Sequence, residues 1–359
     1  MHYFNPYRHI RCSYCCCDFR LGRALLAHDD PQAKEYSTAP QSLFCKYMLG
    51  STSSKRFACP ECKLRLSNLE ISKASLSKTI VVVGPPNTGK STYVAMLVDS
   101  LLGNDGYKFS RSIGLQTYDP RSEEYVASTQ MVQLRYGRLF TAPNSHGEVD
   151  LLEATRPDDS RLTVPLRYMI EASNASFIIN IMDSAGELYG NLRGLQFSTH
   201  LKRVDAFIIL LDPDAFQQNL FGMQGRDKNM GIHRIICETM LANWEDAQKL
   251  PAAFVVHKFD KLKTMGVLPG GITQAFLNQK GALIENYVES ISTKLEEWVR
   301  QHNQSDGIFD FFDNRAFFPV SSLGSTPVTR GGSAFLKGPP KPYGNTHPIA
   351  WLLTQFSKK

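Results

Sequence analysis

The sequence predicts an α/β fold, a doubly wound sheet with helices on both faces, preceded by a small cysteine-rich module. An apolar run leads through a glycine-rich loop into a helical pattern at residues 79–102, which is a strand–loop–helix unit. Short apolar runs and helical patterns then alternate along the chain, as in a parallel sheet with crossover helices. Seven of the eight cysteines precede residue 63. We therefore assign residues 1–78 to the module and 79–359 to the α/β domain.

The segment GPPNTGKS at residues 84–91 has the spacing of a phosphate-binding loop, between a strand at 80–83 and a helix that reaches Leu102. Glycines permit close approach of phosphate, and the amides and dipole at the start of the helix favour its negative charge. Because Pro85 and Pro86 lack an amide proton, the cradle must use amides from Asn87 onward. The expected binding residues are Gly84, Asn87, Thr88, Gly89, Lys90, Ser91 and Thr92.

Four groups are expected to handle the terminal phosphate and Mg²⁺. Lys90 reaches the β- and γ-phosphates as a catalytic residue, and the Ser91 hydroxyl binds the ion. A second apolar run, at residues 177–183, ends in Asp183, which holds Mg²⁺ in proteins of this kind. The amide of Gly186 can contact the γ-phosphate. The alternative is an ordinary strand end with Asp183 capping a turn.

A later apolar run, at residues 252–256, leads into the polar segment HKFD at 257–260. The Asp260 carboxylate can accept two hydrogen bonds from guanine N1 and N2, while the Lys258 stem packs on the base. Adenine has no matching pair of donors, so such an Asp selects guanine. The alternative is a strand-terminal loop without a ligand.

The other patterns complete the expected fold. They predict strands at 204–211 and 316–320, helices at 232–248, 283–299 and 348–356, short strand-like pieces at 131–140, and a surface loop at 324–346.

The cysteines of the module form two CxxC pairs, Cys12 with Cys15 and Cys59 with Cys62. Two such pairs complete a closed tetrahedral site for structural Zn²⁺, which a reducing cytosol favours over disulfides. Thiol redox chemistry is disfavoured because no strand–helix thioredoxin pattern surrounds either pair. One of the four expected ligands can be replaced by Cys16, Cys17 or Cys45.

The net charge of +6 comes from the module, which contains 12 Lys and Arg but only 6 Asp and Glu. Residues 79–359 contain 28 basic and 28 acidic residues and carry no net charge. A basic patch suits nucleic acid, an acidic protein or an anionic membrane, and a solvated face is the plainer interpretation. No apolar run is long enough to cross a bilayer. The first residues lack a secretory pattern, so we expect a cytoplasmic protein.

In this order the motifs resemble those of a Ras-like P-loop GTPase over residues 79–359. GPPNTGKS is similar to the phosphate loop, DSAGE at 183–187 to the DTAGQ switch, HKFD to NKxD, and Ser321-Ser322-Leu323 to SAK. With a zinc-ribbon-like module in front, the layout resembles the bacterial double-GTPase proteins, paired GTPases of conflict or defence gene neighbourhoods. The resemblance implies GTP or GDP, Mg²⁺, Zn²⁺ and a protein partner such as a second GTPase.

Three departures from the family pattern matter. His257 stands where the family has the Asn that ties the base loop to the phosphate loop and supports guanine preference. Glu187 replaces the catalytic Gln that orients water, and its charge implies slow or partner-dependent hydrolysis. Lys90 and Asp183 are 93 positions apart, so an insertion occupies residues 103–165. Within it the candidates for the switch threonine are Thr117, Thr129, Thr141 and Thr163, and those for an activating arginine are Arg111, Arg121, Arg135 and Arg138.

The expected function is a GTP-binding and GTP-hydrolysing molecular switch, with Mg²⁺-assisted phosphoryl transfer to water. An AAA-type ATPase is one alternative, disfavoured because Ser184 rather than Glu follows Asp183. A zinc-ribbon protein that binds nucleic acid and uses nucleotide structurally is the other, supported by the basic module.

Overall fold

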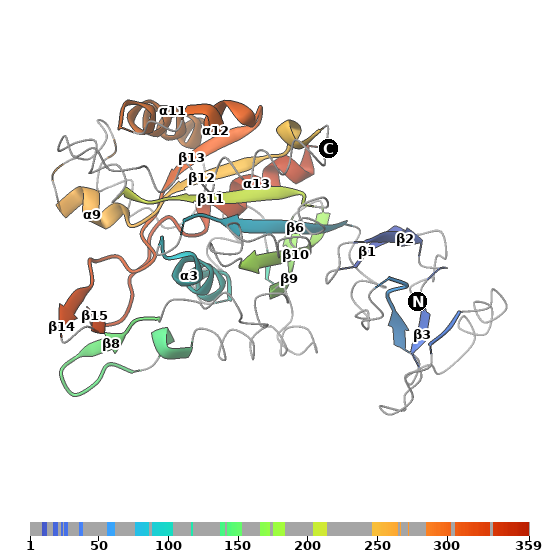
Figure 1. Cartoon of the computed structure of the whole chain (residues 1–359), viewed down its shortest axis with the longest axis horizontal. Helices are drawn as coiled ribbons and strands as arrows, with labels where there is room; N and C mark the ends of the chain where they lie inside the picture. Colours follow the sequence, from blue (N-terminus) through green and yellow to red (C-terminus); the bar gives the residue numbers. More distant parts are fainter. Residues whose placement is uncertain are drawn as a thin grey trace.

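The computed structural model has a seven-stranded sheet at its centre, with helices packed on both faces (Figure 1). The structure describes residues 9–12, 17–20, 23, 25–27, 36–38, 56–61, 76–85, 88–102, 116–117, 137–140, 142–152, 166–172, 175–183, 204–213, 246–264, 266, 272, 285–302, 306–330 and 333–358.

Five neighbouring strands of the sheet are parallel, and two antiparallel strands extend it at one edge. The order is β13-β12-β11-β6-β10-β9-β7. The strands are β6 (Leu76–Val83), β7 (Gln116–Thr117), β9 (Leu166–Ala172), β10 (Ala175–Asp183), β11 (Ala206–Leu211), β12 (Ala252–Val256) and β13 (Arg315–Pro319). Because β6 lies between β10 and β11, the strand order reverses there, and ligands of open α/β sheets bind beside such a reversal at the carboxyl ends of the strands.

Side chains of β6 alternate between two cores, which is why a continuous apolar run is needed. Ile80 and Val82 pack with α3 (Lys90–Leu102) and α13 (His347–Ser357) on one face. Val81 and Val83 pack with α11 (Glu285–His302) and α12 (Asp306–Phe311) on the other. Each β6 side chain in this list is fully buried. The mixed α/β class with a parallel central sheet is therefore confirmed.

Several element bounds differ from the sequence expectation. Strand β6 begins at Leu76, ahead of the strand expected at 80–83. Phe259–Thr264 forms the short helix α9, which begins within the polar segment HKFD and was not predicted. Gly137–Phe140 is a 3-10 helix, so the strand expectation for these residues is wrong, because their pattern reflects one turn packed by the buried Leu139.

The surface loop expected at 324–346 is wrong for part of that segment, which contains a hairpin of β14 (Val328–Arg330) and β15 (Ser333–Lys337). Strand β15 also pairs with β8 (Glu148–Asp150) of the expected insertion. Backbone pairing to a distant segment stabilises strands that have little apolar pattern of their own. The two helices expected at 283–299 and 348–356 are confirmed as α11 and α13, and most of the helix expected at 232–248 lies outside the described residues.

The module contains two small sheets. The hairpin β1 (His9–Arg11) and β2 (Asp18–Arg20) lies beside the start of β6, and β3 (Leu25–Ala27), β4 (Tyr36–Thr38) and β5 (Arg56–Ala58) form the other sheet (Figure 1). Among the helices that the structure describes, none combines the length and the apolar character needed to cross a membrane.

Candidate functional site

The expected phosphate loop follows β6 at its carboxyl end and leads into α3. Lys90 Nζ donates hydrogen bonds to the carbonyl oxygens of Gly84 at 2.9 Å and Pro85 at 2.8 Å. The Thr88 hydroxyl also donates to the Pro85 carbonyl, at 2.8 Å. The loop therefore folds back on the Lys90 side chain, whose ammonium lies at the start of α3. Charge and helix dipole both favour an anion at this position.

Gly89 is required at its position by two constraints. Its φ of +84° suits glycine, and a Cβ there would lie 2.9 Å from His257 Cε1. The first helical hydrogen bond of α3 runs from the Tyr93 amide to the Gly89 carbonyl at 2.8 Å. Because Gly89 has no side chain, the chain can pass from the loop into α3 while its backbone lies in contact with the His257 ring. Ser91 and Thr92 follow in the first turn and are half-buried, whereas Asn87 lies outside the described residues.

His257 joins the phosphate loop to the segment that resembles SAK. Its Nδ1 lies 2.7 Å from the Thr88 carbonyl oxygen, and its Nε2 lies 2.7 Å from Ser322 Oγ. A carbonyl only accepts, so the proton belongs on Nδ1, and Ser322 donates to Nε2. Burial lowers the pKa of His257 to about 4, so the ring is neutral at pH 7. His257 therefore makes the contact between the two loops, at the position where the resembling NKxD motif has Asn.

The hydrogen-bond chain continues from Ser322 to Asn345. Ser322 Oγ is 3.3 Å from Asn345 Oδ1, while Asn345 Nδ2 has no partner among the described residues in this orientation. Because Ser322 gives its one proton to His257, a turned Asn345 amide that presents Nδ2 satisfies both groups. The Tyr93 hydroxyl donates to the Asn345 carbonyl at 3.2 Å. The chain therefore returns to α3, the helix that the phosphate loop begins.

Asp260, the expected base-reading residue, lies in the first turn of α9 and is only 9% exposed. The hydroxyls of Ser321 and Thr326 donate to its two carboxylate oxygens, Oδ1 and Oδ2. The backbone fixes this region: the Phe259 amide donates to the Val320 carbonyl at 3.0 Å. Leu323 contributes its carbonyl, which accepts from the Lys341 amide at 2.9 Å.

Lys258 has a φ of +54°, the one positive value of a non-glycine residue in the described part of the chain. Such conformations cost free energy and cluster at functional sites. The strained backbone turns the chain between His257 and Asp260. Lys258 Nζ lies 3.4 Å from Asp212 Oδ2, directly after β11.

The residues expected to handle Mg²⁺ and water are described only in part. Asp183 ends β10 and pairs with Val82 of β6, so the end of β10 lies beside the start of the phosphate loop. The structure gives the backbone of Asp183, while Gly186 and Glu187 lie outside the described residues. Of the switch-threonine candidates, only Thr117 is described, by its backbone in β7. Of the four candidate arginines, Arg138 is described, by its backbone in the 3-10 helix Gly137–Phe140, whereas Arg111, Arg121 and Arg135 lie outside the described residues.

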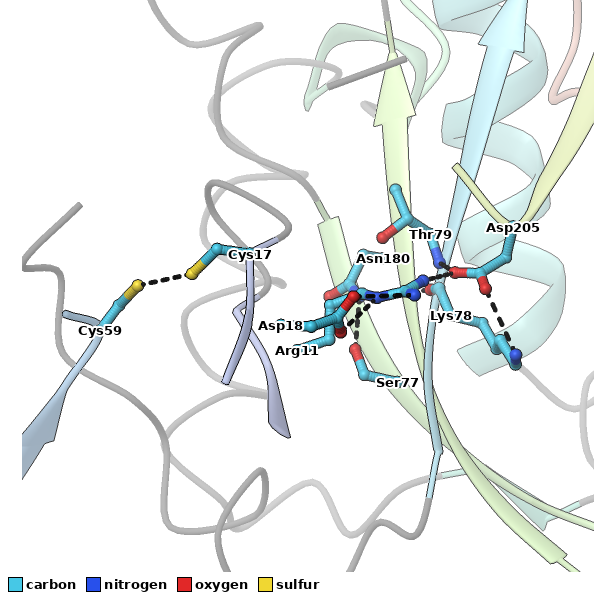
Figure 2. A network of polar contacts seen from close by, with 9 residues as sticks. All are labelled: Arg11, Cys17, Asp18, Cys59, Ser77, Lys78, Thr79, Asn180 and Asp205. Atoms are coloured by element: carbon cyan, nitrogen blue, oxygen red, sulfur yellow. Dashed lines mark hydrogen bonds and ion pairs between the residues drawn. The ribbon is translucent and has the colours of Figure 1, made fainter. Parts of the chain in front are cut away.

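The amino end of the sheet carries a separate charged network (Figure 2). Asp205 accepts hydrogen bonds from Arg11 of β1, from Lys78 Nζ at 3.3 Å and from the Thr79 amide at 2.9 Å. Asp18 of β2 pairs with Arg11 at 3.0 Å. Burial is the largest single effect on the pKa of Arg11, and it acts to lower that pKa. The attraction and hydrogen bonds of Asp205 and Asp18 together outweigh burial, so the pKa of Arg11 is raised. This network joins the hairpin of the module to β6.

Two cysteines of the module face one another in Figure 2. Cys17 Sγ and Cys59 Sγ are 3.1 Å apart and buried, and the Cys12 amide donates to the Cys17 carbonyl at 2.9 Å. Cys15, Cys16, Cys45 and Cys62 lie outside the described residues. Within the described residues, no group of three or more Cys, His, Asp or Glu side chains is arranged to hold a metal. The contact brings Cys17 close to Cys59, one of the four expected ligands.

Sequence reasoning missed four side chains of the site: Tyr93, Asp212, Thr326 and Asn345. Tyr93 lies at a position of the helical pattern where an apolar residue is expected, so the pattern does not indicate that its hydroxyl makes a hydrogen bond. Thr326 and Asn345 lie in a segment rich in Gly, Pro and Ser that matches no motif. Asp212 follows an apolar strand, as Asp183 does, and that position was a usable signal.

Neither the protein-family models nor the curated proteins with which the chain was compared gave a match.

Proposed function

We propose that the protein is a guanine-nucleotide-binding switch that takes GTP with Mg²⁺ and hydrolyses it slowly or with a partner. The observation that carries the proposal is the contact of His257 with both Thr88 and Ser322. It joins a loop with phosphate-binding chemistry to a loop with base-reading chemistry, at one end of the parallel sheet. A nucleotide needs a phosphate-binding loop and a base-reading loop side by side, whereas a bare phosphate needs only the first of these.

The residues have separate roles in the proposal. Lys90 and the amides at the start of α3 bind the phosphates, and Ser91 with Asp183 holds Mg²⁺, which supplies charge neutralisation at the terminal phosphates. Asp260 accepts from guanine N1 and N2, and Lys258 covers the base. Glu187 accepts a hydrogen bond from the attacking water. Gly186 senses the γ-phosphate, so hydrolysis changes the loop that a partner protein contacts.

Calorimetric titration of the full chain with GTP and with ATP, each with Mg²⁺, tests the proposal. Lys90→Ala should weaken binding of both by about 10- to 100-fold, because a charged hydrogen bond is lost. Asp260→Ala should weaken GTP alone. Equal affinity of the wild type for ATP, or a GTP affinity indifferent to Asp260→Ala, would refute guanine selectivity.

We also propose that the module binds structural Zn²⁺ through cysteine thiolates, with Cys17 and Cys59 among the ligands. Thiolates on tetrahedral zinc lie about 3.8 Å apart, since each bond is about 2.3 Å. The sulfurs of these two residues, far apart in sequence, lie 3.1 Å apart, so a small outward movement of the two side chains would give that separation. Metal analysis of purified Cys17→Ser and Cys59→Ser should show less zinc than the wild type and than the control Cys237→Ser, which changes the one cysteine outside the module. A wild type that holds no zinc when purified without chelators contradicts the proposal.

A further inference from the structure

The carboxylate of Asp260 is held from two sides by hydroxyl groups. Ser321 Oγ donates to Oδ1, and Thr326 Oγ1 donates to Oδ2 at 3.1 Å. Ser321 belongs to the segment that resembles SAK, whereas nothing in the sequence marks Thr326. Asp260 is largely buried, so its carboxylate depends on protein groups rather than water for orientation.

The direction of the Ser321 bond is fixed by its neighbours. Ser321 Oγ accepts from the Gly324 amide at 3.0 Å, so its single proton is directed to Asp260. Gly324 has a φ of +77°, and a Cβ there would lie 2.0 Å from the Lys341 carbonyl oxygen. Ser321 and Tyr343 also exchange backbone hydrogen bonds of 3.1 and 2.9 Å. The turn that carries the chain from Ser321 to Thr326 is therefore built against the returning segment.

The position of Thr326 is set by the hairpin that it precedes. Strand β14 begins two residues later, at Val328, and pairs with β15. Strand β15 pairs in turn with β8, and the Gly338 amide donates to the Gly147 carbonyl at 2.8 Å. Thr326 is itself exposed, so its methyl group packs in no core. Its defined interaction is the hydrogen bond to Asp260.

The hydrogen bonds from Ser321 and Thr326 occupy only part of the acceptor capacity of the Asp260 carboxylate. A carboxylate has about four acceptor positions, two on each oxygen. Ser321 takes one on Oδ1 and Thr326 takes one on Oδ2, so each oxygen keeps one acceptor. Guanine offers two parallel donors, N1–H and N2–H, at its Watson–Crick edge. An oriented carboxylate accepts both, whereas a freely rotating one loses part of that match.

We propose that Thr326 is a positioning residue for base recognition, which fixes Oδ2 of Asp260 so that the carboxylate meets N1–H and N2–H together. The proposal rests on the function proposed above and adds a specificity determinant to it. The 2-amino group of the base is the feature that Thr326 makes readable. Inosine lacks that group and retains N1–H, so ITP isolates the second hydrogen bond.

The test compares GTP, ITP and inorganic tripolyphosphate, each titrated with Mg²⁺ into wild type, Thr326→Val and Thr326→Ser. Thr326→Val keeps the shape and removes the donor, while Thr326→Ser keeps the donor. We expect Thr326→Val to lower GTP affinity roughly tenfold, the loss of one hydrogen bond to a charged group. Its preference for GTP over ITP should shrink toward parity, and tripolyphosphate binding should not change. Thr326→Ser should stay within about twofold of wild type.

Three results would overturn the proposal. Thr326→Val with wild-type GTP affinity and an unchanged GTP-to-ITP ratio would leave Thr326 without a role in recognition. Tighter GTP binding by Thr326→Val would make the hydroxyl a competitor of the base. An equal loss of affinity for GTP, ITP and tripolyphosphate would mean that the substitution disturbs the structure as a whole. Thermal melts of Thr326→Val and Thr326→Ala test for such a loss of stability. Failure of the function itself is separate: the wild type would then not prefer GTP to ATP.

Discussion

Two aspartates, one at each end of the central sheet, are held in opposite ways. Asp205 at the amino end accepts from two cations, Arg11 and Lys78, and from the Thr79 amide. Asp260 at the carboxyl end accepts from the hydroxyls of Ser321 and Thr326. Opposite charges cancel a carboxylate, whereas hydroxyls orient it and leave its charge in place. The charged network at the amino end attaches the module hairpin to the sheet, and the hydroxyls at the carboxyl end orient a carboxylate for the proposed recognition of the base.

The largest effect on stability is expected from removing Asp205, the carboxylate at the centre of the charged network. Asp205→Ala leaves Arg11 and Lys78 without their shared partner, and removal of one member of a buried pair costs about 3–5 kcal/mol. Since Arg11 keeps 23% exposure, we expect the lower end of that range in the free energy of unfolding from urea melts. The control is Asp18→Ala, whose side chain is 53% exposed, with an expected loss below about 1 kcal/mol. Equal losses in the two variants would contradict the distinction.

The carboxyl end should respond to acid through two histidines, His257 and His347. Burial lowers the pKa of both His257 and His347 to about 4. Between about pH 6.5 and pH 4 the unfolded chain binds protons that the folded protein excludes, so stability falls as the pH falls through this window. Each histidine contributes a loss on the order of 3 kcal/mol.

A variant separates the two contributions. His257→Asn keeps hydrogen-bonding ability without a titrating ring, so its stability should fall less steeply over the same window, with His347 still contributing. Urea melts at several pH values measure the slope. The same slope in variant and wild type would show that the pKa of His257 is not lowered by folding.

Much of the sheet could be predicted from sequence, because the buried parts of the parallel strands are mostly apolar runs, interrupted in β10 by the buried Asn180. The β14–β15 hairpin could not, because it depends on pairing with β8, far away in the sequence. The site divides in the same way. Lys90 and Asp260 belong to motifs with their own spacing. Thr326 acts through a turn fixed by Lys341 and Tyr343, and no local pattern encodes that contact.

The smallest effect is expected at an ion pair of the hairpin whose arginine side chain is mostly exposed to solvent. Arg330 of β14 lies 3.2 Å from Glu148 of β8, and its side chain is 68% exposed. Solvent screens such a pair, so Arg330→Ala should change the free energy of unfolding by less than about 0.5 kcal/mol and leave GTP affinity unchanged. A loss comparable to that of Asp205→Ala would mean that the hairpin depends on charge rather than on backbone pairing.

The nucleotide bound to the purified protein tests the central proposal most directly. The full chain is incubated with equal GTP and ATP and with Mg²⁺, desalted and denatured, and the released nucleotide is identified by chromatography. We expect a guanine nucleotide in nearly stoichiometric amount, and little from Lys90→Ala. A released adenine nucleotide, or a protein that stays empty, would contradict the assignment of Asp260 as the residue that reads the base.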